Sequence, residues 1–162
     1  MIVPFSEMSN DSKIWIYQSN RKFIDTELDE INDLIVKFLN TWTAHGSELL
    51  TSFEIKYNRF IIIALNESVK PASGCSIDYC IHFIQDLEKK YNIDLLDKMN
   101  VTFKQGKYII YKPINDFKEL VRKKSVSKNT IVFNNLVVDI SDYMENWEIS
   151  AEKSWHSRFF NV

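Results

Sequence analysis

The spacing of apolar residues along the chain predicts two long amphipathic helices. Residues 25–42 open with helix-capping and acidic side chains, and their apolar positions then recur every three or four residues. Residues 76–91 repeat this helical spacing. Gly46 lies just past the first helix, where a left-handed C-terminal residue is expected.

Runs rich in β-branched and aromatic residues predict the strands. They are residues 13–17, the pairs 52–57 with 60–65 and 99–104 with 107–112, and residues 130–133. The run at residues 60–65, FIIIAL, is apolar throughout, which is typical of a central strand. Through the fourth strand the order is β-α-β-β-α-β, the ferredoxin-like order. We therefore predict an α+β fold with two helices on one face of an antiparallel sheet.

The length predicts a single domain over residues 1–162, because no repeat or low-complexity linker interrupts the chain. We expect residues 1–12 to be flexible and residues 113–162 to form a C-terminal extension packed on the core. No secretory signal and no apolar run of about 18 residues is present, which favours a cytoplasmic protein without a membrane span. The two cysteines, Cys75 and Cys80, lie five apart on one predicted helix, so a disulfide between them is not expected.

Glycine excludes the common nucleotide-binding loops. The only glycines are Gly46, Gly74 and Gly106, and no two are close enough to share a phosphate loop. Both G-x-G-x-x-G and the Walker A pattern need at least two glycines within a few positions. We therefore predict no cofactor of the nucleotide class, and no cofactor of another kind is indicated.

Several runs resemble a family of small, uncharacterised Bacteroidota proteins that often carry the label "ABC transporter ATPase". These are WIYQSNRKF (15–23), WTAHG (42–46), YNRFIIIALNES (57–68), ASGCSID (72–78), HFIQDLEKKY (82–91), TIVFNNLV (130–137) and SWHSRF (154–159). The resemblance covers residues 13–160 and implies no assigned activity or catalytic residues. The sequence lacks the phosphate loop that such an ATPase needs, so we expect no genuine ABC ATPase.

A thiol at a predicted helix start is the first candidate site. The unpaired N–H groups and the dipole of a helix N-terminus can lower the pKa of a cysteine such as Cys75. A nucleophilic thiolate needs a base, and His45 and His156 are the candidate partners. The neighbouring residues are predicted to contact a ligand: Ser73, Gly74 and Ser76. A small buried cysteine at a capped helix start gives the same pattern, and no ligand spacing predicts a metal site.

The second candidate is a basic segment in an acidic protein. The net charge of the chain is -2, yet residues 98–128 carry nine basic and two acidic side chains. Its predicted polyanion contacts are Lys104, Lys107, Lys112, Arg122, Lys123 and Lys124, interleaved with Phe103, Tyr108, Tyr111 and Phe117. Lysines and aromatic rings on strands can bind phosphates and stack bases. Lysines that protect an edge strand or end a helix are the alternative interpretation.

The C-terminal run contains the third candidate, Trp155 and Arg158, residue types favoured at the centres of contacts. The alternative is that this tail docks onto its own sheet. Our leading hypothesis is a cytoplasmic α+β protein that binds a protein or small-molecule partner and has no catalytic activity. The alternatives are a thiol enzyme that uses Cys75 and an RNA- or polyanion-binding module that uses residues 98–128. The sequence does not predict the oligomeric state.

Overall fold

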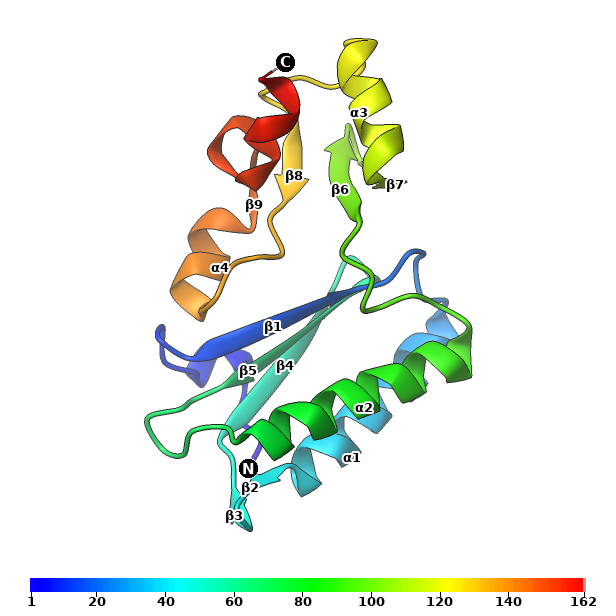
Figure 1. The fold of residues 1–162 in the computed structure, drawn as a ribbon. Coiled ribbons are helices and arrows are strands. Elements are labelled where there is room, and N and C mark those ends of the chain that lie inside the picture. Colours follow the sequence, from blue (N-terminus) through cyan, green and yellow to red (C-terminus); the bar gives the residue numbers. More distant parts are fainter. Residues whose placement is uncertain (162) are drawn as a thin grey trace. The chain divides into compact units, whose positions relative to one another are not determined.

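A computed structural model, which describes residues 1–161, confirms the α+β class with antiparallel sheets (Figure 1). The helices are α1 (Asp25–Thr41), α2 (Gly74–Tyr91), α3 (Ile114–Arg122) and α4 (Ile140–Asn146), with 3-10 turns η1 (Phe5–Glu7), η2 (Ala151–Lys153) and η3 (Trp155–Phe160). The strands are β1 (Lys13–Gln18), β2 (Thr43–Ala44), β3 (Ser47–Glu48), β4 (Thr51–Lys56), β5 (Phe60–Leu65), β6 (Asn100–Gln105), β7 (Tyr108–Pro113), β8 (Ile131–Phe133) and β9 (Glu148–Ser150). Within the described residues no helix is long and apolar enough to cross a bilayer.

The chain divides into two compact units, although the sequence suggested one core. Unit 1 comprises Met1–Leu96 with Val138–Ile140, and unit 2 comprises Asp97–Val137 with the residues from Ser141 onward. Each unit has its own cluster of buried apolar residues. The loop 92–99 connects α2 to β6 across this division, and it contains no glycine, proline or serine that would mark it as a linker. The predicted start of the extension, residue 113, falls inside unit 2, since β6 pairs with both β7 and β8.

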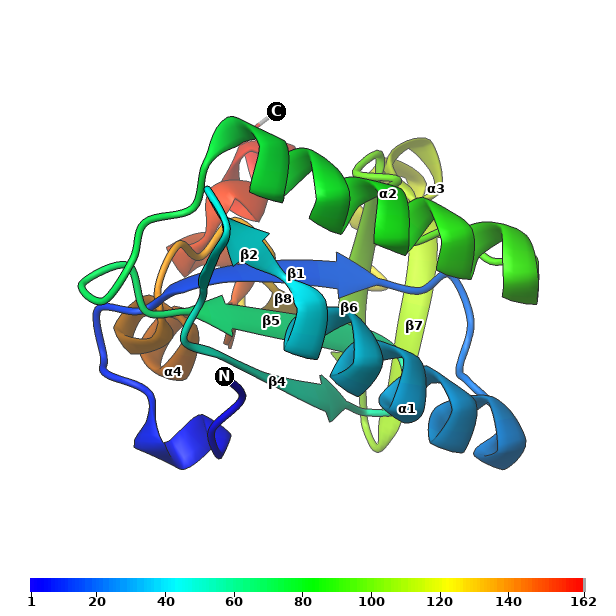
Figure 2. The ribbon, with the colours of Figure 1, turned by 90° about the horizontal axis from the view of Figure 1, so that it is seen from below.

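Unit 1 is a three-stranded antiparallel sheet in the order β1-β5-β4, with α1 and α2 side by side over one face (Figure 2). The central strand is the apolar run Phe60–Leu65, as predicted, and it is buried along its whole length. Alternate residues of this strand, Ile61, Ile63 and Leu65, join the cluster that also contains the inner faces of both helices. The strand alternation and the helical spacing therefore meet in one core.

The predicted fourth strand joins a different sheet, so the ferredoxin-like order is not confirmed. This strand, β6, belongs to unit 2, where the order is β7-β6-β8-β9. On the edge of β1 that faces away from β5 lies a short return of the chain, in which Lys13 bridges to Asp139 and the Ile14 N–H donates to the Val138 carbonyl at 3.1 Å. The apolar pattern of a strand specifies which of its faces is buried, but it does not specify the strand with which it pairs. The sequence therefore did not predict the sheet to which β6 belongs.

The first residues, which we expected to be flexible, are tied to unit 1. The N-terminal ammonium of Met1 donates to the Leu49 carbonyl at 2.8 Å, and the Val3 N–H donates to Thr51 at 3.0 Å. Met8 is buried. Because β4 is an edge strand, its free backbone groups hold this segment in place.

Unit 2 has an aromatic core between its sheet and the helices that pack against it. Phe117 of α3 is fully buried, and its ring contacts those of Phe103, Phe159 and Phe160 at centroid distances of 5.5, 5.7 and 6.3 Å. The C-terminal turn η3 thus packs on the same core as β6 and α3.

Candidate functional site

The Cys75 thiol lies on the surface at the start of α2. Ser73 is the N-cap: its hydroxyl accepts from the Ser76 N–H at 3.1 Å, and the Ser76 hydroxyl accepts from the Ser73 N–H at 2.6 Å. Cys75 is exposed, whereas Cys80 one turn further on is buried. The alternative of a buried cysteine at this helix start is therefore wrong. The two serine hydroxyls are hydrogen-bonded within the helix start, whereas the Cys75 thiol beside them faces solvent.

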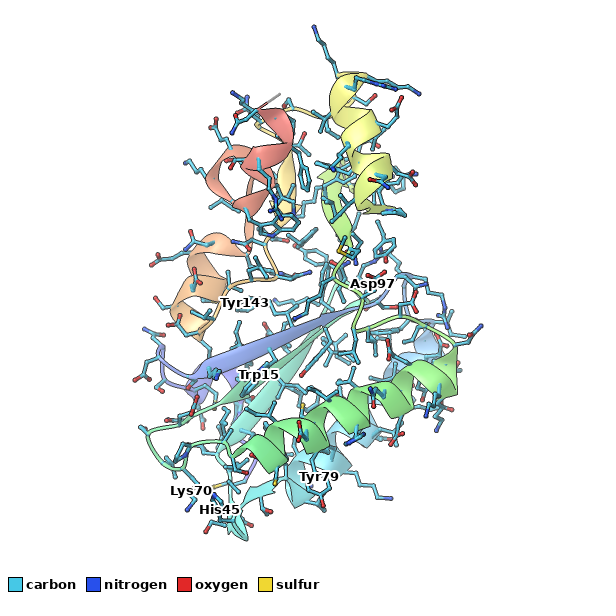
Figure 3. All side chains as sticks on the ribbon, in the orientation of Figure 1. Trp15, His45, Lys70, Tyr79, Asp97 and Tyr143 are labelled. Carbon is cyan, nitrogen blue, oxygen red and sulfur yellow. The ribbon has the colours of Figure 1, made fainter. Side chains whose placement is uncertain are left out.

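His45 lies on the hairpin that packs against the same end of α2 (Figure 3). The β2–β3 turn contains His45 and Gly46, both left-handed with φ of 50° and 76°. Helix α1 ends at Thr41, so the prediction that Gly46 ends this helix is wrong. The indole N–H of Trp42 donates to the Ser76 carbonyl at 2.7 Å, which fastens the hairpin to α2 near Cys75.

His156 is a buried residue of unit 2. Its side chain has 0% exposure, its Nδ1 lies 2.6 Å from the Ser154 hydroxyl, and its ring stacks on Trp155 at 3.9 Å. Burial, with a smaller contribution from the charge of Arg158, lowers its pKa to about 4. Cys75 and His156 belong to different units, so neither unit contains that pair. The Cys75-dependent catalytic set stays a prediction.

The basic segment belongs entirely to unit 2, and part of it is paired. Lys104 forms an ion pair with Glu148 at 3.0 Å and lies over the Phe133 ring. Arg122 hydrogen-bonds to Glu119, and Lys123 lies 3.7 Å from the same carboxylate. The Arg122 hydrogen bond is the main reason that the pKa of Glu119 lies below its usual value. The end of α3 is therefore only partly neutralised.

The remaining lysines of this segment make no ion pair within residues 1–161: Lys98, Lys107, Lys112, Lys118, Lys124 and Lys128. Among the interleaved aromatic rings, Phe103 and Phe117 are core residues, so they are not available to stack bases. Tyr108 is 63% exposed at the hairpin turn, with the Lys107 ammonium over its ring at 5.5 Å. Tyr111 is half-buried, and its hydroxyl donates to an Asp97 carboxylate oxygen at 3.4 Å. The surface thus offers charge, one exposed ring and one half-buried ring.

Trp155 and Arg158 contact each other within unit 2. The Arg158 guanidinium lies over the rings of Trp155 at 5.1 Å and Phe159 at 5.6 Å. Trp155 is half-buried and packs against the core that contains Phe117. This arrangement favours the alternative in which the tail docks on its own sheet, and a ligand-binding role for Trp155 and Arg158 stays a prediction.

The burial of one charged residue, Arg59, was not predicted from the sequence. Arg59 lies in the β4–β5 turn, directly before the apolar run of β5, and is only 8% exposed. The signal was an arginine next to a strand predicted to be buried. Its charge made it resemble an ordinary solvated turn residue.

No group of three or more His, Cys, Asp or Glu side chains in the described part of the chain is arranged to hold a metal ion. Comparison with protein-family models, curated proteins and solved structures finds no match to this chain. The resemblance to the Bacteroidota family therefore stays a prediction, and the functional argument depends on the residues themselves.

Proposed function

We propose that the protein is a non-enzymatic binding protein whose unit 2 contacts a polyanion of the RNA type. The observation that carries this proposal is the division of charge between the two units. Unit 1 has 9 basic and 15 acidic side chains, a net charge of −6, whereas unit 2 has 11 basic and 7 acidic side chains, a net charge of +4. A cationic unit within an acidic protein attracts anionic molecules, and this charge distribution is typical of proteins that bind an anionic partner.

The chemistry of the surface indicates contacts to phosphates rather than to bases. The unpaired lysines are point charges on flexible stems, which neutralise phosphates without reading a base sequence. Tyr108 is exposed and can stack on one base, whereas Tyr111 is half-buried and Phe103 and Phe117 are enclosed in the core. We therefore expect binding that depends on salt and only weakly on sequence.

The test compares two matched pairs of lysines. Lys123 and Lys124 directly follow the last residue of α3 in unit 2, while Lys89 and Lys90 occupy the last turn of α2 in unit 1. Binding of a single-stranded RNA oligonucleotide is measured by fluorescence anisotropy over a range of salt concentrations. The K123Q/K124Q variant is expected to bind more weakly and to lose about 1.4 from the slope of log K against log salt, since each phosphate contact contributes about 0.7.

The K89Q/K90Q variant is the control and is expected to bind as the unchanged protein does. Absence of binding at low salt, or equal losses in the two variants, would reject the proposal. A heparin column run in parallel shows whether the surface requires a nucleic acid or accepts any polyanion.

A thiol function of Cys75 is the second candidate, and the exposure of this residue at a capped helix start favours it. Both cysteines are free, which fits the reducing cytoplasm expected from the sequence. We expect no magnesium-dependent ATP hydrolysis, because no two glycines of the chain can form a phosphate loop.

A further inference from the structure

We infer that Arg59 anchors a site for a small oxyanion, a carboxylate or a phosphate, in unit 1. The side chain is more than nine-tenths buried, and its Nε has no acceptor. Its guanidinium takes part in no hydrogen bond or ion pair with any residue of 1–161. Burying a charge without a partner opposes folding strongly, and residues 1–161 supply no counter-charge to Arg59.

The backbone holds Arg59 in a defined place. Tyr57 and Asn58 adopt left-handed conformations with φ of 53° and 55°, and the Arg59 N–H closes the turn on the Lys56 carbonyl at 3.0 Å. The Arg59 carbonyl accepts from the Ser19 N–H at 2.8 Å, which continues the register in which Gln18 pairs with Phe60. By strand alternation, Arg59 belongs to the face of the sheet that carries Ile61 and the helices.

Two carboxylates of the adjoining helix ends, those of Glu27 and Glu88, already have partners. At the start of α1, Glu27 binds Arg21 through both carboxylate oxygens, at 2.8 and 2.9 Å. At the end of α2, one oxygen of Glu88 accepts from the N–H groups of Leu95 and Leu96 at 2.8 and 3.2 Å. A further hydrogen bond, from the Phe23 N–H to the Asn58 carbonyl at 2.7 Å, ties the Arg59 turn to this region. These two carboxylates bind other groups and neither pairs with Arg59, which is consistent with an external anion as its partner.

The shape of the guanidinium selects the ligand chemistry. The Nε–H and an adjacent terminal N–H form a planar fork that matches two oxygens of a carboxylate or a phosphate. Burial lowers the pKa of Arg59, yet an arginine keeps its charge at neutral pH. Partial exclusion of water strengthens the attraction to an anion. This site lies in unit 1 and does not depend on the polyanion surface of unit 2.

The experiment is thermal unfolding of the full chain in sodium chloride, sodium phosphate or sodium acetate at equal ionic strength. A ligand of the folded state raises Tm with its concentration. The unchanged protein is expected to gain Tm in phosphate or acetate relative to chloride. Arg59→Met is expected to have an equal or higher Tm in chloride, because an unpaired charge is gone, and to lose the response to the oxyanion.

Two further variants keep the test decisive. Arg59→Lys retains the charge without the fork and is expected to respond less than the unchanged protein, and it serves if Arg59→Met fails to fold. Lys56→Met changes an exposed charge on the same hairpin and is expected to respond normally, as is the K123Q/K124Q variant of unit 2. A protein with no oxyanion-specific gain, or an Arg59→Met variant that still shows it, overturns the inference.

Discussion

The two units differ in how they place their charged residues. Unit 1 is acidic, and it pairs Arg21 with Glu27 in a bidentate contact at the start of α1. Unit 2 is basic, and most of the lysines of residues 98–128 form no ion pair with a carboxylate in the described part of the chain. Unit 2 also contains Asp97 before the segment and, after it, four acidic and two basic residues, so its net charge is +4 and not the +7 of the segment alone. Charge has to be counted over structural units before it indicates a partner.

The hydrophobic cores of the two units differ in the kinds of residue that build them. Helices and strands of unit 1 contribute mainly aliphatic residues, such as Ile31, Ile35 and Ile63. Unit 2 is organised around one ring, Phe117, which contacts β6 through Phe103 and the C-terminal turn through Phe159. The stability of unit 2 is therefore concentrated in fewer side chains.

The largest effect is expected from Phe117→Ala, which should cost about 3–5 kcal/mol, because a fully buried ring is lost from the centre of the core. Ile63→Ala, in unit 1, is the matched control, with an expected cost of about 2–5 kcal/mol. Urea unfolding gives the stability, and hydrogen exchange read by peptide assigns the loss to a unit. A loss in both units would support the single domain expected from the sequence. A Phe117→Ala cost below about 1 kcal/mol would contradict the central role of this ring.

Acid is expected to weaken unit 2 before unit 1. The pKa of His156 falls from 6.5 to about 4 in the folded state, so the unfolded chain binds the proton first. The neutral His156 ring therefore contributes fully to the free energy of unfolding above pH 6.5. This contribution is lost as the pH falls toward 4, and the loss is about 3 kcal/mol at most. Hydrogen exchange at pH 7 and pH 4.5 measures this loss. His156→Gln should remove the pH dependence of unit 2 in this window, and an unchanged dependence would contradict the assignment.

A smaller acid effect is expected in unit 1. The hydrogen bond from Arg21, with a further one from the Ile24 N–H, lowers the pKa of Glu27 from 4.5 to about 2. The folded-state pKa is lowered, so the stabilisation is present above pH 4.5 and is lost as the pH falls toward 2. Arg21 is partly exposed, so solvent screening reduces the expected contribution to about 1 kcal/mol. Arg21→Met should flatten the pH dependence of unit 1 below pH 4.5, and an unaltered profile would show that the pair is dispensable.

The smallest change in stability is expected from Cys75→Ser, under about 0.5 kcal/mol, because the side chain is exposed. The informative comparison is alkylation of the folded protein by iodoacetamide, read by peptide mass. Cys75 should react much faster than Cys80, whose pKa is raised to about 11 by burial. Equal rates, or a Cys75 that reacts only after denaturation, would remove the thiol function from consideration.

Local features of the fold were predictable from the sequence. Alternation and helical spacing located α2, the central strand β5 and the β6–β7 hairpin, because each depends on neighbours in the chain. The sheet that β6 joins depends on residues far away, and no local pattern encodes it. Burial of Arg59 was unpredictable for a related reason, since it follows from how the turn packs. Exposure of Cys75 was one of two alternatives that only the structure could separate.

The return of residues Val138–Ile140 to the edge of β1 has a consequence for synthesis of the chain. During synthesis, residues Met1–Leu96 of unit 1 leave the ribosome first. The segment of unit 1 that bridges to Lys13 follows only after the whole of Asp97–Val137 has been made. At about 5–20 residues per second, that interval lasts roughly 2–8 s. Throughout it the nascent chain carries an uncovered strand edge, which is a template for pairing with another molecule. Chaperone demand should therefore peak before residue 138 leaves the ribosome, and a fragment that ends at Leu96 should self-associate.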